Sequence, residues 1–225
     1  MTLVKVFNNA WLHNNAAWVQ LLGLCPLLAV SNSLVNALGL SLATALVTVG
    51  SNTSVSLLAR MIPDHVRLPC FVLIIATFTT TAMLLLQAYA FDLYLGIALF
   101  VQIIVTNCMI LSRAEAFASR QPALPALVDA LGTACGFTLA LLTLGITREL
   151  LGSGTLFAGM EQLFGPNAAD WRLEVLPANT TLTLLKLPPG AFLGAGLLLA
   201  LANSLRRTAP STPLDSPQSD SATDQ

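Results

Sequence analysis

The segment LLGLCPLLAV, residues Leu21–Val30, places a cysteine directly before a proline inside an otherwise apolar run. Proline lacks the backbone N–H that a helix interior requires, and its ring clashes with the preceding turn. We therefore expect an interrupted helix at this point. Cys25 is then either inert packing, as a small hydrophobic side chain, or the functional reason for the interruption.

The composition of the whole chain is that of a membrane protein. Of 225 residues, 55% are hydrophobic and 9% are charged, and the mean hydropathy is +0.75, whereas soluble domains carry about 25% charged residues. The formal net charge of −1 argues against nucleic acid as a partner, because it provides no basic patch for phosphates. Four cysteines in a chain facing mainly membrane and cytoplasm do not indicate a disulfide framework.

Stretches without Asp, Glu, Lys or Arg predict how often the chain crosses the membrane. A spanning helix needs roughly 17–25 mostly apolar residues, and the 54 uncharged residues between Lys5 and Arg60 hold two such spans. Four further uncharged stretches follow. The prediction is an all-α membrane protein with six spans, near residues 17–36, 39–58, 68–90, 94–112, 127–147 and 188–205.

The positions of the basic residues predict the orientation, because cytoplasmic loops of membrane proteins are enriched in Lys and Arg. With six spans, seven basic residues lie on the side of both termini. The other three, Arg148, Arg172 and Lys186, lie in one loop, residues 148–187, on the opposite side. Residues 1–207 form the membrane domain, with both termini in the cytoplasm. The Pro-, Ser- and Asp-rich tail, residues 208–225, is expected to be disordered.

A faint internal repeat divides the membrane domain into halves, near residues 8–92 and 93–207. VQLLGLC at Val19–Cys25 resembles VQIIVTNC at Val101–Cys108. Three spans in each half give the halves opposite directions, which is the arrangement of an inverted repeat.

The second motif places the polar Asn107 beside Cys108, and hydrogen bonds of this kind tune metal-bound sulfur. Counting from Arg113, however, puts Cys108 nearer the cytoplasmic face than Cys25. The two cysteines meet only if the fourth span is also broken, with Arg113 and Glu115 held inside protein. We expect such a break at Cys108 as well as at Cys25, although no proline or glycine marks it.

The remaining polar and sulfur-containing residues have weaker claims to function. Cys70 begins the third span and Cys135 lies among small residues that favour close helix packing, so both are expected to be structural. The polar stretch at Ser51–Ser56 fits an ion path or interhelical hydrogen bonds equally well. Asp129 is expected to be an ordinary carboxylate at a helix start. The sequence shows no phosphate loop, flavin-attachment motif or nucleophile triad.

Five stretches taken together resemble the E subunits of Rnf (Rsx) electron-transport complexes, which are related to the D subunits of sodium-pumping NADH:quinone reductases. The similarity runs from about residue 8 to residue 205, and GLCPLLAV and LPPGAF favour the Rnf branch. The stretches are Trp18–Val30, Ser51–Pro69, Ile104–Ser119, Gly145–Phe157 and Leu187–Phe192.

The resemblance implies a bacterial inner-membrane protein that pairs with the homologous, inverted A subunit of the Rnf complex, alongside the B, C, D and G subunits. Family members hold an iron centre, described as a 2Fe–2S cluster, with two cysteines from each of the two chains, and these match Cys25 and Cys108. Iron–sulfur clusters generally take four thiolates, which agrees with two per chain. The implied function is electron transfer coupled to Na⁺ or H⁺ transport, with no flavin or NAD bound by this chain.

Two other functions stay open from the residues alone. A secondary transporter would use inverted repeats and broken helices equally well, and the iron content of the purified complex separates that possibility. A scaffold for partner proteins would carry inert cysteines, and redox spectroscopy separates that one.

The predicted orientation can be tested with alkaline phosphatase fusions. A fusion after Arg207 should be inactive, because this enzyme matures only outside the cytoplasm, and a fusion within residues 152–186 should be active. Activity in whole cells is compared after correction for the amount of fused protein. The reverse pattern would contradict the orientation.

Overall fold

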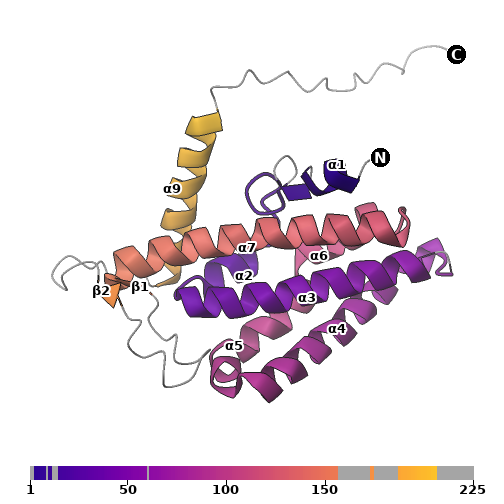
Figure 1. Ribbon diagram of the computed structural model, residues 1–225, viewed down its shortest axis with the longest axis horizontal. Coiled ribbons are helices and arrows are strands. Elements are labelled where there is room, and N and C mark those ends of the chain that lie inside the picture. Colours follow the sequence, from indigo (N-terminus) through magenta and orange to yellow (C-terminus); the bar gives the residue numbers. More distant parts are fainter. Residues whose placement is uncertain are drawn as a thin grey trace, which may run out of the picture.

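The computed structural model describes residues 3–8, 10–11, 15–59, 61–156, 173–174 and 187–206. Its long elements are all helices (Figure 1). The predicted loop residues Arg172 and Lys186 and the predicted tail lie outside the described residues. The helices are α1 (Leu3–Asn8), α2 (Leu24–Val30), α3 (Leu34–Leu58), α4 (Arg67–Tyr89), α5 (Phe91–Ile103), α6 (Cys108–Arg113), α7 (Ala123–Ser153) and α9 (Pro188–Arg206).

Short elements connect these helices. Single helical turns lie at Asp64–Val66 and Ile104–Thr106, and a wide π-type turn at Ala114–Ala118 extends α6. Strands β1 (Thr155–Leu156) and β2 (Leu173–Glu174) pair in antiparallel register.

Prolines mark the starts of the helices rather than their interruptions. The first turn of a helix tolerates proline because its N–H groups have no partner within the helix. The proline next to Cys25 is one example, since it occupies the third position of α2. First-turn prolines in four helices follow this rule: Pro26, Pro69, Pro125 and Pro189.

Helices α3 and α7 lie side by side at the centre of the fold and run antiparallel (Figure 1). At one end the Leu34 N–H donates to Glu149 Oε2 at 2.7 Å, and at the other the Ser56 hydroxyl donates to the Gln121 carbonyl at 2.6 Å. More than half of the most apolar part of each helix is buried, 61% in α3 and 56% in α7. These two helices are therefore the scaffold on which the others pack.

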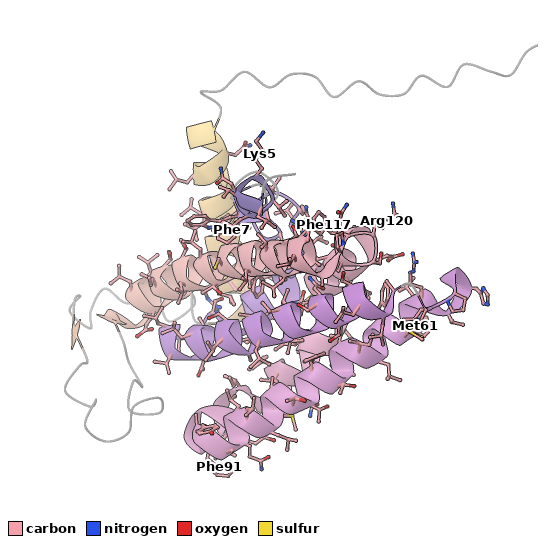
Figure 2. All side chains as sticks on the ribbon, turned by 45° about the vertical axis from the view of Figure 1, so that its right-hand side comes forward. Lys5, Phe7, Met61, Phe91, Phe117 and Arg120 are labelled. Carbon is pink, nitrogen blue, oxygen red and sulfur yellow. The ribbon has the colours of Figure 1, made fainter. Side chains whose placement is uncertain are left out.

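Helices α4 and α5 lie outside this pair and are much more exposed. Only 22% of the apolar part of α4 is buried, and leucines such as Leu73 on α4 and Leu99 on α5 are 70% and 75% exposed. Such a surface suits lipid, where exposed leucine carries no hydrophobic penalty. Figure 2 shows Met61 and Arg120 at one end of the bundle and Phe91, the first residue of α5, at the opposite end.

Among the described residues, four helices are long and apolar enough to cross a membrane, and they match the second to fifth predicted spans. They are Leu34–Leu58, Arg67–Tyr89, Tyr94–Ala118 and Ala123–Gly152. The prediction of an all-helical membrane chain is confirmed to this extent.

The first and sixth predicted spans differ from the prediction. Residues 17–36 hold the seven-residue α2 and the first three residues of α3, because the backbone before α2 turns through positive φ at Leu21 and Gly23. Helix α9 is 19 residues long with a shorter apolar part, Pro189–Leu201, and runs across α7 rather than along it (Figure 1). The described residues therefore do not confirm a six-helix inverted repeat.

Helix α7 is longer at both ends than the predicted span at residues 127–147. It ends where Gly154 takes the left-handed conformation (φ 67°) that commonly closes helices. Two residues consequently differ from their predicted settings. Arg148 belongs to the helix and not to a loop, and Asp129 lies in its second turn and not at its start.

The packing of α4 on α3 predicts the effect of enlarging Gly50. An added Cβ would lie 2.6 Å from two ring carbons of Phe78, so Gly50→Ala should destabilise the fold by about 1–3 kcal/mol. Gly196→Ala on α9 is the matched control, because none of the described neighbours comes within 4 Å of its added Cβ. It should be neutral or stabilising by up to about 1 kcal/mol through helix propensity. Thermal unfolding in detergent measures the stability of both variants. Equal destabilisation by Gly50→Ala and Gly196→Ala would contradict the close packing of Phe78 against Gly50.

Candidate functional site

The break before α2 arises from its backbone conformation. Gly23 adopts φ 76°, which glycine accepts freely, and Leu21 adopts φ 54°, which costs roughly 1–2 kcal/mol for an L-residue. Helix α2 begins directly afterwards, so Cys25 is its second residue, and the thiol is exposed. The interruption expected at this segment is present.

A second break precedes Cys108. Helix α5 gives way to one 3₁₀ turn, after which Asn107 takes an extended conformation (φ −65°, ψ 113°). The Asn107 side chain accepts a hydrogen bond from the Met109 N–H at 3.1 Å and so caps α6. Cys108 is the first residue of α6, and its thiol is exposed. An asparagine cap, rather than proline or glycine, therefore begins this helix.

The two breaks contact each other directly. The Gly23 backbone N–H donates to the Cys108 sulfur, with 3.1 Å between nitrogen and sulfur, across 85 residues of sequence. A Cβ on Gly23 would lie only 3.1 Å from both Asn107 Oδ1 and a ring carbon of Phe137. Cys25, two residues after Gly23, is thereby brought to the same junction as Cys108. Sequence reasoning assigned the polar contact at this sulfur to Asn107 and missed Gly23.

The other two cysteines belong to different parts of the fold. Cys70 lies half-buried in the first turns of α4, and Cys135 is exposed on α7. The small residues near Cys135 do pack closely, because an added Cβ at Gly132 would lie 3.0 Å from the Phe7 carbonyl oxygen, although Cys135 itself is exposed. Figure 2 shows Phe7 beside α7. Within the described part of the chain, no group of three or more His, Cys, Asp or Glu side chains could hold a metal ion.

An open pocket of about 610 Å³ lies beside α2 and includes the Cys25 thiol in its wall. Most of the lining residues are apolar, and Arg148 is the charged residue among them. The lining residues are Leu24, Cys25, Leu28, Ala29, Asn32, Phe100, Arg148 and Phe192.

Arg148 and Glu149, near the end of α7, are both only 2% exposed. Arg148 Nη1 donates to the Leu28 carbonyl at 3.1 Å and to the Ser31 hydroxyl at 2.8 Å, and Nη2 donates to the Leu187 carbonyl at 3.3 Å. Glu149 accepts from the first residue of α3. Sequence reasoning missed both residues by placing them in a loop, although two adjacent opposite charges after an apolar run were a usable signal.

Arg113 and Asp129 form a second buried polar contact, between α6 and α7. Their side chains are 11% and 4% exposed, and Nη1 lies 3.3 Å from Oδ1. Arg113 is therefore held inside the protein, as a broken fourth span requires, whereas Glu115 is exposed. Asp129 was wrongly expected to be an ordinary carboxylate at a helix start.

Several hydroxyls of the polar stretch in α3 donate hydrogen bonds to backbone carbonyls, whereas the buried Asn52 amide has no hydrogen-bond partner among the described residues. The Ser51 hydroxyl donates to Thr48 and the Thr53 hydroxyl to Val49, within the helix. Ser56 bonds to the segment before α7. Only the Ser56 bond joins two segments, and none of these bonds accounts for Asn52, so both interpretations of the stretch stay open.

The sequence was compared with protein-family models and with curated proteins. The family model described as "Rnf-Nqr subunit, membrane protein" matches residues 3–199. The chain belongs to the Rnf-Nqr family.

Curated relatives in this family are named as the E subunits of ion-translocating oxidoreductase complexes. The protein of Vibrio parahaemolyticus serotype O3:K6 (strain RIMD 2210633) is 51% identical over 199 residues, which is 88% of this chain and 86% of the relative. That of Aliivibrio fischeri (strain ATCC 700601 / ES114) is 53% identical, covering 89% and 87%. That of Shewanella sp. (strain W3-18-1) is 55% identical, covering 84% and 82%. The predicted resemblance to the E subunits of Rnf complexes is confirmed.

The contact between the two breaks predicts the effect of Gly23→Ala in this Rnf-Nqr chain. Alanine at φ 76° costs roughly 1–2 kcal/mol, and its Cβ would press on Asn107 and Phe137, so α2 should move away from α6. The measurement is cross-linking of Cys25 to Cys108 by a short bifunctional maleimide, in a chain carrying Cys70→Ser and Cys135→Ser. Gly96→Ala is the control, because its Cβ would lie at an ordinary 3.6 Å from Asn36 Oδ1. An unchanged cross-link in Gly23→Ala would contradict the contact.

Proposed function

We propose that this chain is the E subunit of an ion-translocating oxidoreductase complex and that Cys25 and Cys108 supply two ligands of an iron–sulfur centre. The observation that carries the proposal is the direct contact of the two helix breaks, through the Gly23 N–H and the Cys108 sulfur. It brings two exposed thiols, distant in sequence, to one junction. The relatives' shared name supplies the redox setting.

The donor set present in this chain fits half of such a centre. Iron–sulfur clusters are held by cysteine thiolates, generally four, and two exposed thiols lie at this junction. The described residues offer no third and fourth ligand beside them. The remaining two thiolates would come from the homologous A subunit, which has the opposite orientation, and a 2Fe–2S cluster would be completed between the two chains.

The residues around the junction hold and tune the ligands. The Gly23 N–H places a positive dipole end on the Cys108 sulfur, which stabilises negative charge there, and such hydrogen bonds raise the potential of iron–sulfur centres. The Asn107 cap fixes the start of α6 and with it the direction of Cys108. The bound centre would supply one-electron transfer, and the protein supplies its position between membrane faces.

The wider role follows from the complex. The chain would pass electrons between redox centres of the B, C, D and G subunits, coupled to Na⁺ or H⁺ transport, in a bacterial inner membrane with both termini cytoplasmic. With Arg148 within α7 and Arg113 held inside the protein, six basic residues remain on the side of the termini against two, Arg172 and Lys186, which supports this orientation. We propose six crossings in the assembled complex, with α2 as half of the first.

Replacing either proposed ligand tests the centre. Cys25→Ser and Cys108→Ser should each abolish the iron signal and electron transfer, because the cluster is left with three thiolates. Cys70→Ser and Cys135→Ser are matched controls and should change little. Iron and acid-labile sulfide are assayed in the isolated pair formed by this chain and the A subunit, together with the electron paramagnetic resonance spectrum.

Two results would overturn this assignment. Loss of iron in Cys70→Ser with retention in Cys25→Ser would place the ligands elsewhere. A wild-type pair without iron would favour a transporter or a scaffold.

A further inference from the structure

Arg148 is a charged residue buried within a membrane-spanning helix. An ionisable side chain in this setting is costly unless its donors are satisfied, and it commonly marks a functional position. Its 2% exposure and its hydrogen bonds to two carbonyls and a hydroxyl show that the protein provides specific acceptors.

The guanidinium group connects helix α7 to two other parts of the chain. One nitrogen binds the end of α2 through Leu28 and Ser31, and the other binds Leu187, just before α9. A planar fork with fixed donor directions can serve acceptors on two segments at once, whereas the lysine ammonium is a single compact point charge. The geometry therefore requires arginine and not simply a positive charge.

Helix α2 needs such a contact to hold its position. A seven-residue helix is far too short to be stable alone, and its carboxyl end carries partial negative charge that a cation stabilises. The adjacent Glu149 accepts from the Leu34 N–H at the positive start of α3. Arg148 and Glu149 thus hold both sides of the three-residue connection, residues 31–33, and each charge matches the helix end that it contacts.

We propose that Arg148 is a positioning residue for Cys25. By holding the carboxyl end of α2, it fixes the helix whose second residue is Cys25, and both side chains line the same pocket. The significance for electron transfer rests on the proposed function, but the positioning of the thiol does not. Arg148 touches the end of α2 and acts on the site through that helix.

The first test reads the position of α2 without any metal. Arg148→Lys and Arg148→Met are made in the complete complex carrying Cys70→Ser and Cys135→Ser, and iron is removed by acid and chelator. The rate of maleimide cross-linking between Cys25 and Cys108 should fall at least about threefold in both variants, because charged hydrogen bonds that orient α2 are lost. Arg120→Lys and Arg120→Met, at an exposed arginine, should leave the rate unchanged.

The second test reads the loaded complex by the midpoint potential and paramagnetic resonance line shape of the iron centre. Positioning predicts that Arg148→Lys resembles Arg148→Met, with a shifted potential and a broadened signal. If lysine restores both readouts, the charge alone acts and the proposal is overturned. Wild-type behaviour of both variants in cross-linking and potential also overturns it.

A milder variant covers the case in which the Arg148 variants do not assemble. Ser31→Ala removes one acceptor of the Arg148 guanidinium group, at 2.8 Å. The cross-linking rate should then lie between those of the wild type and of the Arg148 variants. An unchanged rate would overturn the proposal. The two proposals also fail separately. If the Arg148 variants cross-link more slowly but Cys25 and Cys108 bind no iron, the positioning role stands and the iron–sulfur centre is refuted. If Cys25 binds iron but the Arg148 variants cross-link at the wild-type rate, the positioning role is refuted and the centre stands.

Discussion

Every interrupted helix in a membrane leaves backbone N–H and C=O groups that lipid cannot satisfy, and each such group costs several kcal/mol unless protein supplies a partner. This chain interrupts two helices, and its tertiary contacts answer that constraint. The N–H of Gly23 finds the Cys108 sulfur, the cap of α6 comes from Asn107, and Arg148 and Glu149 hold the facing ends of α2 and α3. The rest of the structure keeps these groups in place.

The scaffold and the site occupy different parts of the fold. Helices α3 and α7 bury more than half of their most apolar parts, and α7 carries Arg148 and Asp129, the charged residues that reach the short helices α2 and α6. The proposed ligands Cys25 and Cys108 lie on the short helices α2 and α6, and both are exposed. A cysteine on a short helix at the edge of the scaffold can bind a metal together with a second chain. A cysteine buried between α3 and α7 could not reach a second chain.

Sequence reasoning succeeded where the signal is local. Length and hydropathy located the four long helices, and the turn residues at Gly23 and Pro26 located the first break. The break at Cys108 was expected, but the Asn107 cap that makes it was not identified, because an asparagine inside an apolar run resembles any buried polar residue. Sequence reasoning failed at Arg148, because a charge after an apolar run looks like the end of a span, and the adjacent Glu149 does not reveal which distant carbonyls bind the guanidinium group.

The sequence by itself determined the membrane class, the Rnf-Nqr family, the long helices and the cysteines worth testing, since these depend on composition, periodicity and close similarity. The tertiary structure alone decided that Gly23 meets Cys108 across 85 residues and that Arg148 holds Leu28 across 120. The physical reason is that a hydrogen-bond partner is chosen by packing. The backbone groups freed at a break are identical along the chain, and only the approach of another helix determines which donor or acceptor reaches them.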